Sequence, residues 1–193
     1  MKKLQQFAIL CILDSLGVHI ALGLPIVITA TAEIMNTIAY NAAASQTMIN
    51  FGKIALNKQA NQPTTCVLDA RTTGFNAVQT ICNNGAETFE SSPAKILLQV
   101  ENGLTVTITG IANQSYLIGE QHQQLLNITD IQSHSILFDG GDRYIPITSN
   151  VSSAVAHNQQ VVLYLGGVLT IPPTTVADHY DNNNALDLIM GVN

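Results

Sequence analysis

Two short acidic stretches contain the aspartates that could bind a metal ion. DGGD carries Asp139 and Asp142, and ADHYDNNN carries Asp178 and Asp181. Carboxylate oxygens are the ligands that calcium, a hard cation, prefers, and the second stretch could also bind a sugar. Glycines after an aspartate are typical of a hairpin turn, because glycine adopts positive φ at no steric cost. We therefore interpret DGGD as a turn and ADHYDNNN as a solvated loop, and we predict no metal and no cofactor.

Catalytic groups are harder to assign. The five histidines are scattered, and the chain contains no G-x-S-x-G, HExxH or glycine-rich phosphate loop. No acid, base and nucleophile can be named from the residues. We predict that the protein is not an enzyme, with a hydrolase built on a β-sandwich as a minor alternative.

The cysteines point to an oxidising compartment. Cys11 lies in the N-terminal apolar stretch, and Cys66 and Cys82 form an even pair in the rest of the chain. A disulfide between them would close a loop of about fifteen residues and stabilise the fold by roughly 3 kcal/mol in the chain-entropy model. Two buried free thiols are the alternative. The pair predicts a disulfide in an exported protein.

The N-terminus, MKKLQQFAILCILDSLGVHIALGLP, has the features of a signal peptide. Two lysines precede an apolar region, and small residues offer cleavage after Gly23 or after Ala32. An uncleaved membrane anchor is the alternative, but Asp14 would cost an inserting helix about 2.5–3.5 kcal/mol. We predict a signal peptide over residues 1–23, cleavage extending at most to 32, contact with the membrane only during export, and a periplasmic, cell-surface or extracellular protein.

Composition sets further limits on function. The chain has 193 residues, of which only 10% are charged, and its net charge is −6. Soluble domains usually contain about 25% charged residues. Few lysines and arginines remain after the signal, so no basic patch is available for a nucleic-acid backbone. One exported domain over residues 26–193 is expected.

The segment IVITATAEIMNTIAY, residues 26–40, alternates with a period of two. An ordinary strand has about 5–6 residues, so this segment predicts an unusually long N-terminal strand. Such a strand can pair with the last strand of its own chain, or it can leave and complete a neighbouring copy by donor-strand pairing. Copies of the chain or related subunits are the predicted partners. The predicted assembly residues are Ile26, Ile28, Ala30, Ala32, Ile34 and Ile38.

The rest of the chain consists of short strand-like runs separated by turn signals. LTVTITG alternates cleanly, and QQVVLYLGGVLTIPP holds two strands with a Gly-Gly break between them. This spacing predicts an all-β fold, a single antiparallel sandwich. The residues predicted for its core are Phe51, Leu104, Val106, Ile108, Leu163, Leu165 and Leu169.

Two motifs support a family resemblance. INFGKIA and LYLGGVLTIPPTTVADHY resemble the L-x-F-G and G-G-x-L-x-V motifs of a bacterial family of exported, uncharacterised domains, which is similar in style to spore-coat-U-like and fimbrial subunit domains. The resemblance implies an Ig-like, pilin-like sandwich that polymerises through its N-terminal strand. The alternative is a self-complemented monomer that binds a ligand or acts as an adhesin. The closing segment ADHYDNNNALDLIMGVN and the insert between the cysteines depart from the family pattern. The matching residues are Ile49, Phe51, Gly52, Gly166, Gly167, Leu169 and Ile171.

Overall fold

The computed structural model describes most of the chain after the predicted signal. The described residues are 24–27, 38–40, 45, 47–57, 61–71, 80–148, 152–181 and 187–192. The predicted signal peptide, residues 1–23, lies outside them. Among the described residues, no helix is long and apolar enough to cross a membrane.

Antiparallel strands form three sheets and one ribbon, which confirms the predicted all-β, sandwich-like fold. The four-stranded sheet has the order β1 (Leu24–Val27), β17 (Asp187–Val192), β8 (Thr105–Ile111), β13 (Ser152–Val155). The six-stranded sheet has the order β16 (Tyr180–Asp181), β9 (Ser115–Gly119), β10 (Leu125–Thr129), β15 (Gly167–Ile171), β4 (Thr64–Leu68), β5 (Thr80–Cys82). The five-stranded sheet has the order β12 (Tyr144–Pro146), β11 (Ile136–Phe138), β14 (Gln160–Leu165), β7 (Ala94–Val100), β2 (Ile38–Tyr40). The ribbon pairs β3 (Lys53–Ala55) with β6 (Glu87–Phe89), and a 3₁₀ turn, η3, spans Gln132–His134.

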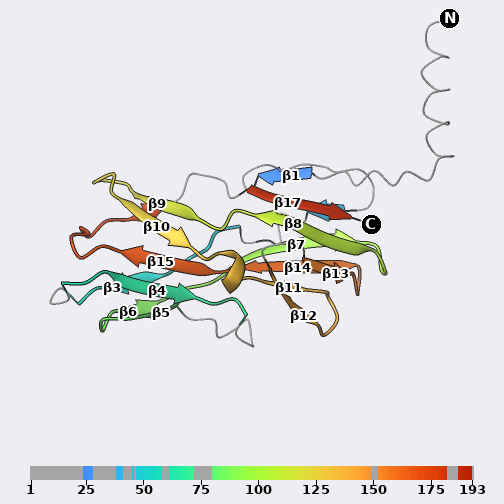
Figure 1. Cartoon of the computed structure of the whole chain (residues 1–193), viewed down its shortest axis with the longest axis horizontal. Coiled ribbons are helices and arrows are strands. Elements are labelled where there is room, and N and C mark those ends of the chain that lie inside the picture. The colour runs from blue at the N-terminus through green and yellow to red at the C-terminus, as the bar shows by residue number, and fades with distance from the viewer. Residues whose placement is uncertain are drawn as a thin grey trace, which may run out of the picture.

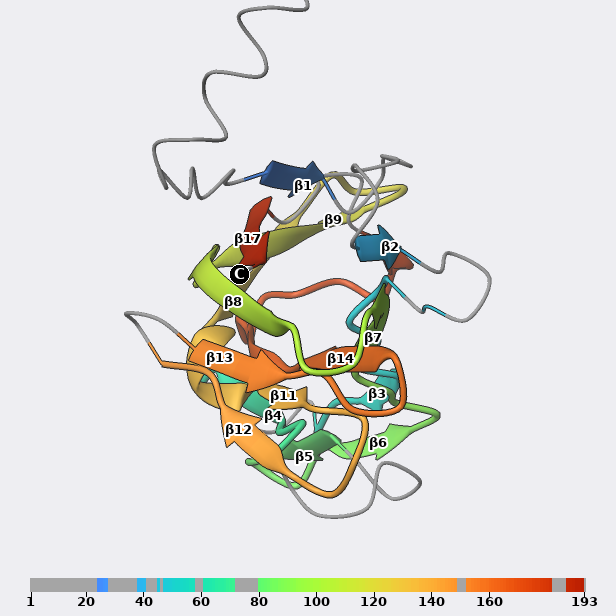
Figure 2. The ribbon, with the colours of Figure 1, turned by 90° about the vertical axis from the view of Figure 1, so that its right-hand side faces the viewer.

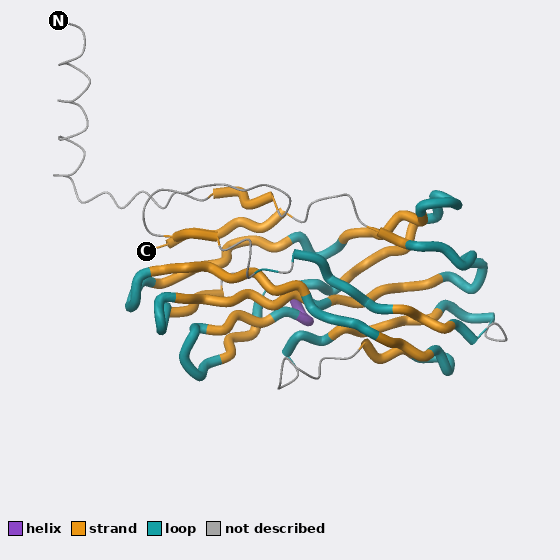
Figure 3. The backbone as a smooth tube through the Cα atoms, turned by 180° about the vertical axis from the view of Figure 1, so that it is seen from behind, coloured by secondary structure: helices purple, strands orange, loops and turns teal. Residues whose placement is uncertain are grey.

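The molecule is elongated, with the six-stranded sheet at one end and the other two sheets at the opposite end (Figure 1). Seen from that opposite end, the four-stranded and five-stranded sheets curve round a shared interior (Figure 2). From behind, the strands follow the long axis, and η3 lies near the middle (Figure 3). The two ends share one apolar core, whose buried residues come from all three sheets.

A single glycine allows the chain to pass from one end of the molecule to the other. β14 ends at Leu165 in the five-stranded sheet, and β15 begins at Gly167 in the six-stranded sheet. A Cβ atom on the intervening Gly166 would lie 2.1 Å from the carbonyl oxygen of Leu68 and 2.6 Å from that of His134. Real Cβ contacts are longer than this, so only glycine fits. The predicted Gly-Gly break is therefore the point where the strand changes sheets.

The core prediction holds for six of its seven residues. Leu104 is only partly buried, although it packs against the core. Alternation explains the pattern in β8, where the valine and isoleucine of LTVTITG face the core and Thr109 is exposed. The confirmed residues, all at most 4% exposed, are Phe51, Val106, Ile108, Leu163, Leu165 and Leu169.

The described ends of the segment 26–40 lie in two different sheets. β1 pairs with the last strand, β17, with Ile26 opposite Leu188. β2 pairs with β7, with Ile38 opposite Val100. Each of these neighbours would otherwise leave a row of backbone N–H and C=O groups unpaired at its sheet's edge, and a short added strand satisfies them. Instead of one long ribbon in one groove, the described residues therefore show two short edge strands.

Candidate functional site

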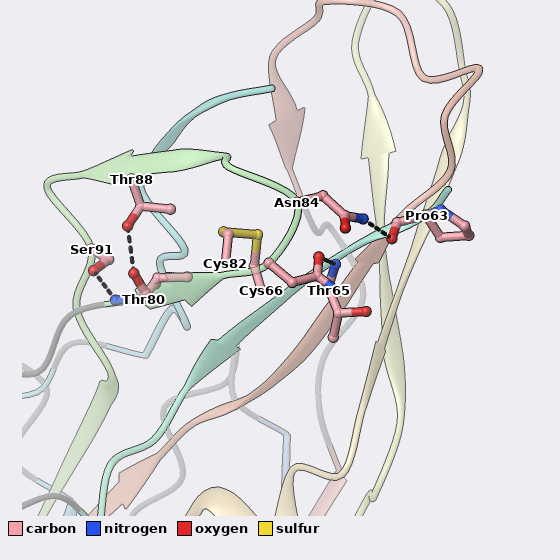
Figure 4. The surroundings of a disulfide bond; sticks show 9 residues. Pro63, Thr65, Cys66, Thr80, Cys82, Asn84, Thr88 and Ser91 are labelled. Atoms are coloured by element: carbon pink, nitrogen blue, oxygen red, sulfur yellow. Dashed lines mark hydrogen bonds between the residues drawn. A yellow bond between two sulfur atoms is a disulfide. The ribbon is translucent and has the colours of Figure 1, made fainter. Parts of the chain in front are cut away.

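The predicted disulfide is present. Cys66 on β4 and Cys82 on β5 are direct partners in the antiparallel register, and their sulfur atoms are bonded (Figure 4). Next to it, the side-chain N–H of Asn84 donates to the carbonyl of Pro63 at 2.9 Å, and the Asn83 amide oxygen accepts from the N–H of Thr65 at 2.8 Å. The bond and these contacts hold β5, one of the two edge strands of the six-stranded sheet, against β4. We interpret the disulfide as a structural staple.

Asp139 and Asp142 belong to the turn between β11 and β12. The Asp139 side chain is almost fully buried, and its Oδ1 accepts hydrogen bonds from the backbone N–H groups of Gly141 at 2.9 Å and Arg143 at 3.2 Å. Gly140 in this turn has a φ of +83°. Asp142 is exposed. The geometry is that of a hairpin turn in which the Asp139 carboxylate stabilises the turn by accepting backbone hydrogen bonds.

Asp178, in the ADHYDNNN stretch, also accepts hydrogen bonds from backbone N–H groups. Its carboxylate, whose side chain is fully enclosed, accepts hydrogen bonds from the backbone N–H groups of Gln121, His122 and His179. The His122 ring nitrogen Nδ1 lies 3.2 Å from Oδ2. Burial of the carboxyl group favours its neutral form, but the hydrogen bonds from His122, His179 and Gln121 outweigh this effect and lower the pKa of Asp178. The carboxylate thus ties the loop before β16 to the β9–β10 turn.

The four candidate calcium ligands are not gathered into a site. Asp139 and Asp142 lie in the five-stranded sheet's hairpin, whereas Asp178 and Asp181 lie beside the edge of the six-stranded sheet. Among the described residues, no group of three or more histidine, cysteine, aspartate or glutamate side chains is placed to hold a metal ion. The described part of ADHYDNNN differs from the freely solvated loop that the sequence predicted, because backbone N–H groups anchor Asp178, and Tyr180 and Asp181 form the short strand β16.

An open cleft of about 790 Å³ lies on the inner face of the six-stranded sheet. One wall is formed by residues of the segment 47–56, and the other by residues 175–181. Met48 and Val176 stand at the two walls and are 56% and 45% exposed. The floor consists of aliphatic side chains from β9, β10 and β15, namely Leu117, Leu126, Ile128, Leu169 and Ile171.

The ribbon strand β3 contributes Lys53 and Ile54 to the wall formed by the segment 47–56. Gly52, with a φ of +83°, lets this segment approach β6 closely, since a Cβ there would lie 2.1 Å from the Phe89 carbonyl oxygen. Sequence reasoning missed the cleft. Its apolar floor residues have the same alternation as an ordinary core strand, and no sequence signal shows that one end of the core stays open.

Tyr180 and Thr175 complete the wall formed by residues 175–181. The Tyr180 hydroxyl lies 2.9 Å from the carbonyl oxygen of Val176 and 3.0 Å from the side-chain oxygen of Gln124, and these two acceptors share its single hydrogen. Desolvation and the nearby carboxylate of Asp178 raise the pKa of Tyr180. The Thr175 hydroxyl oxygen is shielded from solvent and has no hydrogen-bond partner among the described residues. These contacts give the cleft a wall that is fixed by side-chain hydrogen bonds.

The predicted assembly residues are only partly described. Ile26 lies in β1 and Ile38 in β2, each at the edge of a sheet. Residues 28–37, which include Ile28, Ala30, Ala32 and Ile34, lie outside the described residues.

Comparison with known proteins adds no relative: no family model, curated protein or solved structure matches the chain.

Proposed function

We propose that the protein is an exported interaction module of the periplasm or cell surface, not an enzyme, and that it works through addition of its N-terminal strand β1 to the side of β17 that would otherwise be a sheet edge. The antiparallel pairing of β1 with β17, from Leu24 opposite Met190 to Val27 opposite Asp187, carries the proposal. In strand addition, main-chain hydrogen bonds supply the affinity. Pro25 fits this position, because proline lacks an N–H and is confined to edge strands and strand ends.

The same pairing can join residues of one chain or of two. Exchange of β1 between copies would build a pilin-like assembly, in line with the resemblance of the INFGKIA and LYLGGVLTIPPTTVADHY motifs. Retention of β1 by its own chain would give a self-complemented monomer, and the pairing of β1 with β17 in a single chain favours this second candidate. The disulfide between Cys66 and Cys82 supports export to an oxidising compartment in both cases.

A cysteine pair placed in register tests strand exchange. Ile26 and Leu188 are direct partners, so the double variant Ile26→Cys/Leu188→Cys should form a new disulfide on oxidation. Exchange between copies predicts a ladder of covalent multimers on a non-reducing gel, which disappears when the protein is diluted before oxidation. A cross-linked monomer instead identifies the self-complemented form. The control, Ile26→Cys/Val192→Cys, is four residues out of register and should cross-link far less. Equal cross-linking of both variants would overturn the proposed pairing.

The cleavage site provides a second test, because it decides whether β1 exists in the exported protein. Cleavage after Gly23 gives a mature chain that begins at Leu24 and keeps the whole of β1. N-terminal sequencing of the mature protein should therefore start with LPIVI. A mature chain that starts at Glu33, after the alternative site, would lack β1 and contradict the proposal.

A further inference from the structure

β1 is the outermost strand of the four-stranded sheet, beside β17, and its sequence is LPIV (Figure 1). One side of β1 pairs with β17, and no described strand pairs with its other side. An outermost strand presents unpaired N–H and C=O groups to which a further strand can add, and proteins limit such addition with charged residues or proline. β1 contains no charged residue, so Pro25 is the residue of this strand that can limit further addition.

The hydrogen bonds of the sheet show which residues of β17 face β1. In an antiparallel sheet, the backbone polar groups of successive residues point to opposite sides of the strand. The N–H of Ala156 donates to the carbonyl of Leu104 at 2.8 Å, so even-numbered residues at this end of β8 point toward β13 and odd-numbered ones toward β17. Thr107 is opposite Gly191. Gly191 therefore points its backbone groups toward β8, and its neighbour Met190 points its own toward β1.

The same alternation fixes the direction of Pro25. Met190 is opposite Leu24, and Leu188 is opposite Ile26. These four residues direct their backbone polar groups at each other, so the intervening Pro25 directs its nitrogen and carbonyl oxygen away from the sheet. At such an outward position the missing N–H of proline leaves no acceptor of β17 unsatisfied. A slip of β1 by one residue would turn Pro25 toward β17 and leave a carbonyl group there without a donor.

We propose that Pro25 ends the four-stranded sheet, so that β17 accepts one strand and β1 accepts none. The inference rests on the pairing of β1 with β17 in the proposed function and adds a limit to it. Whether β1 comes from the same chain or from another copy, the outward nitrogen of Pro25 cannot donate a hydrogen bond to a further strand. Strand exchange then gives a one-to-one contact between neighbouring copies, and their sheets do not join side by side.

Pro25→Val tests this limit, because valine supplies an N–H and favours a strand. Two copies of the variant can pair through the outward-facing residues 25 and 27, and a symmetric pair gains two hydrogen bonds. Sedimentation velocity of the mature protein, run over a concentration series, should show self-association at least about tenfold stronger than that of the unmodified protein. Pro25→Val/Val27→Pro moves the proline to the next outward position and should return self-association to the unmodified level. Equal self-association of the three proteins would overturn the role of Pro25.

A cysteine pair separates this inference from the strand pairing on which it rests. Leu24 and Met190 are direct partners, so Leu24→Cys/Met190→Cys should form a disulfide on oxidation. In this background, Pro25→Val/Val27→Pro should leave the disulfide yield unchanged, because residue 27 points outward. Pro25→Val/Ile26→Pro should lower the yield at least about fivefold, because residue 26 points at β17. Absence of the disulfide before any proline is moved would overturn the pairing of β1 with β17. A normal yield that falls equally with proline at 26 and at 27 would overturn the direction of Pro25 alone.

Discussion

At the residue scale, the aspartates show how strongly a carboxylate's role depends on its neighbours. The sequence presents Asp139 and Asp178 as candidate calcium ligands, but each accepts hydrogen bonds from several backbone N–H groups. The donors to Asp139 are two and four residues away in the chain. Two of the donors to Asp178, Gln121 and His122, are 57 and 56 residues away. The role of Asp139 could therefore be predicted as a turn from DGGD alone. The anchoring role of Asp178 could not.

The enclosed carboxylate of Asp178 predicts a pH-dependent loop. Its pKa is lower in the folded chain than the ordinary aspartate value of about 3.9, so its stabilising contribution is complete above that value and is lost as the pH falls through the folded pKa. Protection of the Gln121, His122 and His179 amides against hydrogen exchange, relative to the intrinsic exchange rate at each pH, should fall in that acidic range. Asp178→Asn should give the faster exchange already at pH 7, and Asp142→Asn, at an exposed position, should not. Unchanged exchange in Asp178→Asn would contradict the anchoring role.

At the element scale, glycine decides where a strand can change sheets. β14 and β15 form almost one continuous strand, and Gly166 sits where their two sheets separate. The sequence predicts a break at the Gly-Gly pair, because glycine is poorly suited to a strand interior. Which of the two glycines has no room for a side chain depends on the carbonyl groups of Leu68 and His134, and these reach Gly166 only in the folded chain.

Gly166→Ala is expected to destabilise the protein strongly. The added methyl group would lie far inside contact distance of two backbone carbonyl oxygens, and backbone cannot move aside as a side chain can. Overpacking of this kind costs about 1–3 kcal/mol, and sometimes more, so urea unfolding should show a loss at the upper end of this range. Gly141→Ala is the control, because the nearest atoms to its Cβ would be 3.4 Å away. A loss below about 1 kcal/mol for Gly166→Ala would show that the strand crossing can adjust.

At the scale of the whole molecule, the two ends of the elongated fold should unfold together. They share one core, and β14 and β15 run from one end into the other with one residue between them. Calorimetry should give one transition, with equal calorimetric and van 't Hoff enthalpies. Two transitions would show that the six-stranded sheet is a separate cooperative unit. The control is a repeat in reducing agent, which should lower the transition temperature without splitting the peak, because the Cys66–Cys82 bond lies within one sheet.

The sequence by itself determined the all-β class, the disulfide and most of the core. These features depend on local alternation, on the even pair of cysteines and on apolar side chains such as Val106 and Leu163, all of which can be read along the chain. Only the tertiary structure decided that the described ends of the segment 26–40 join two different sheets, that Asp178 anchors a loop, and that a cleft opens beside Val176. Sheet edges, backbone donors from distant turns and the walls of a cleft arise from contacts between residues far apart in sequence, and alternation along a strand carries no information about them.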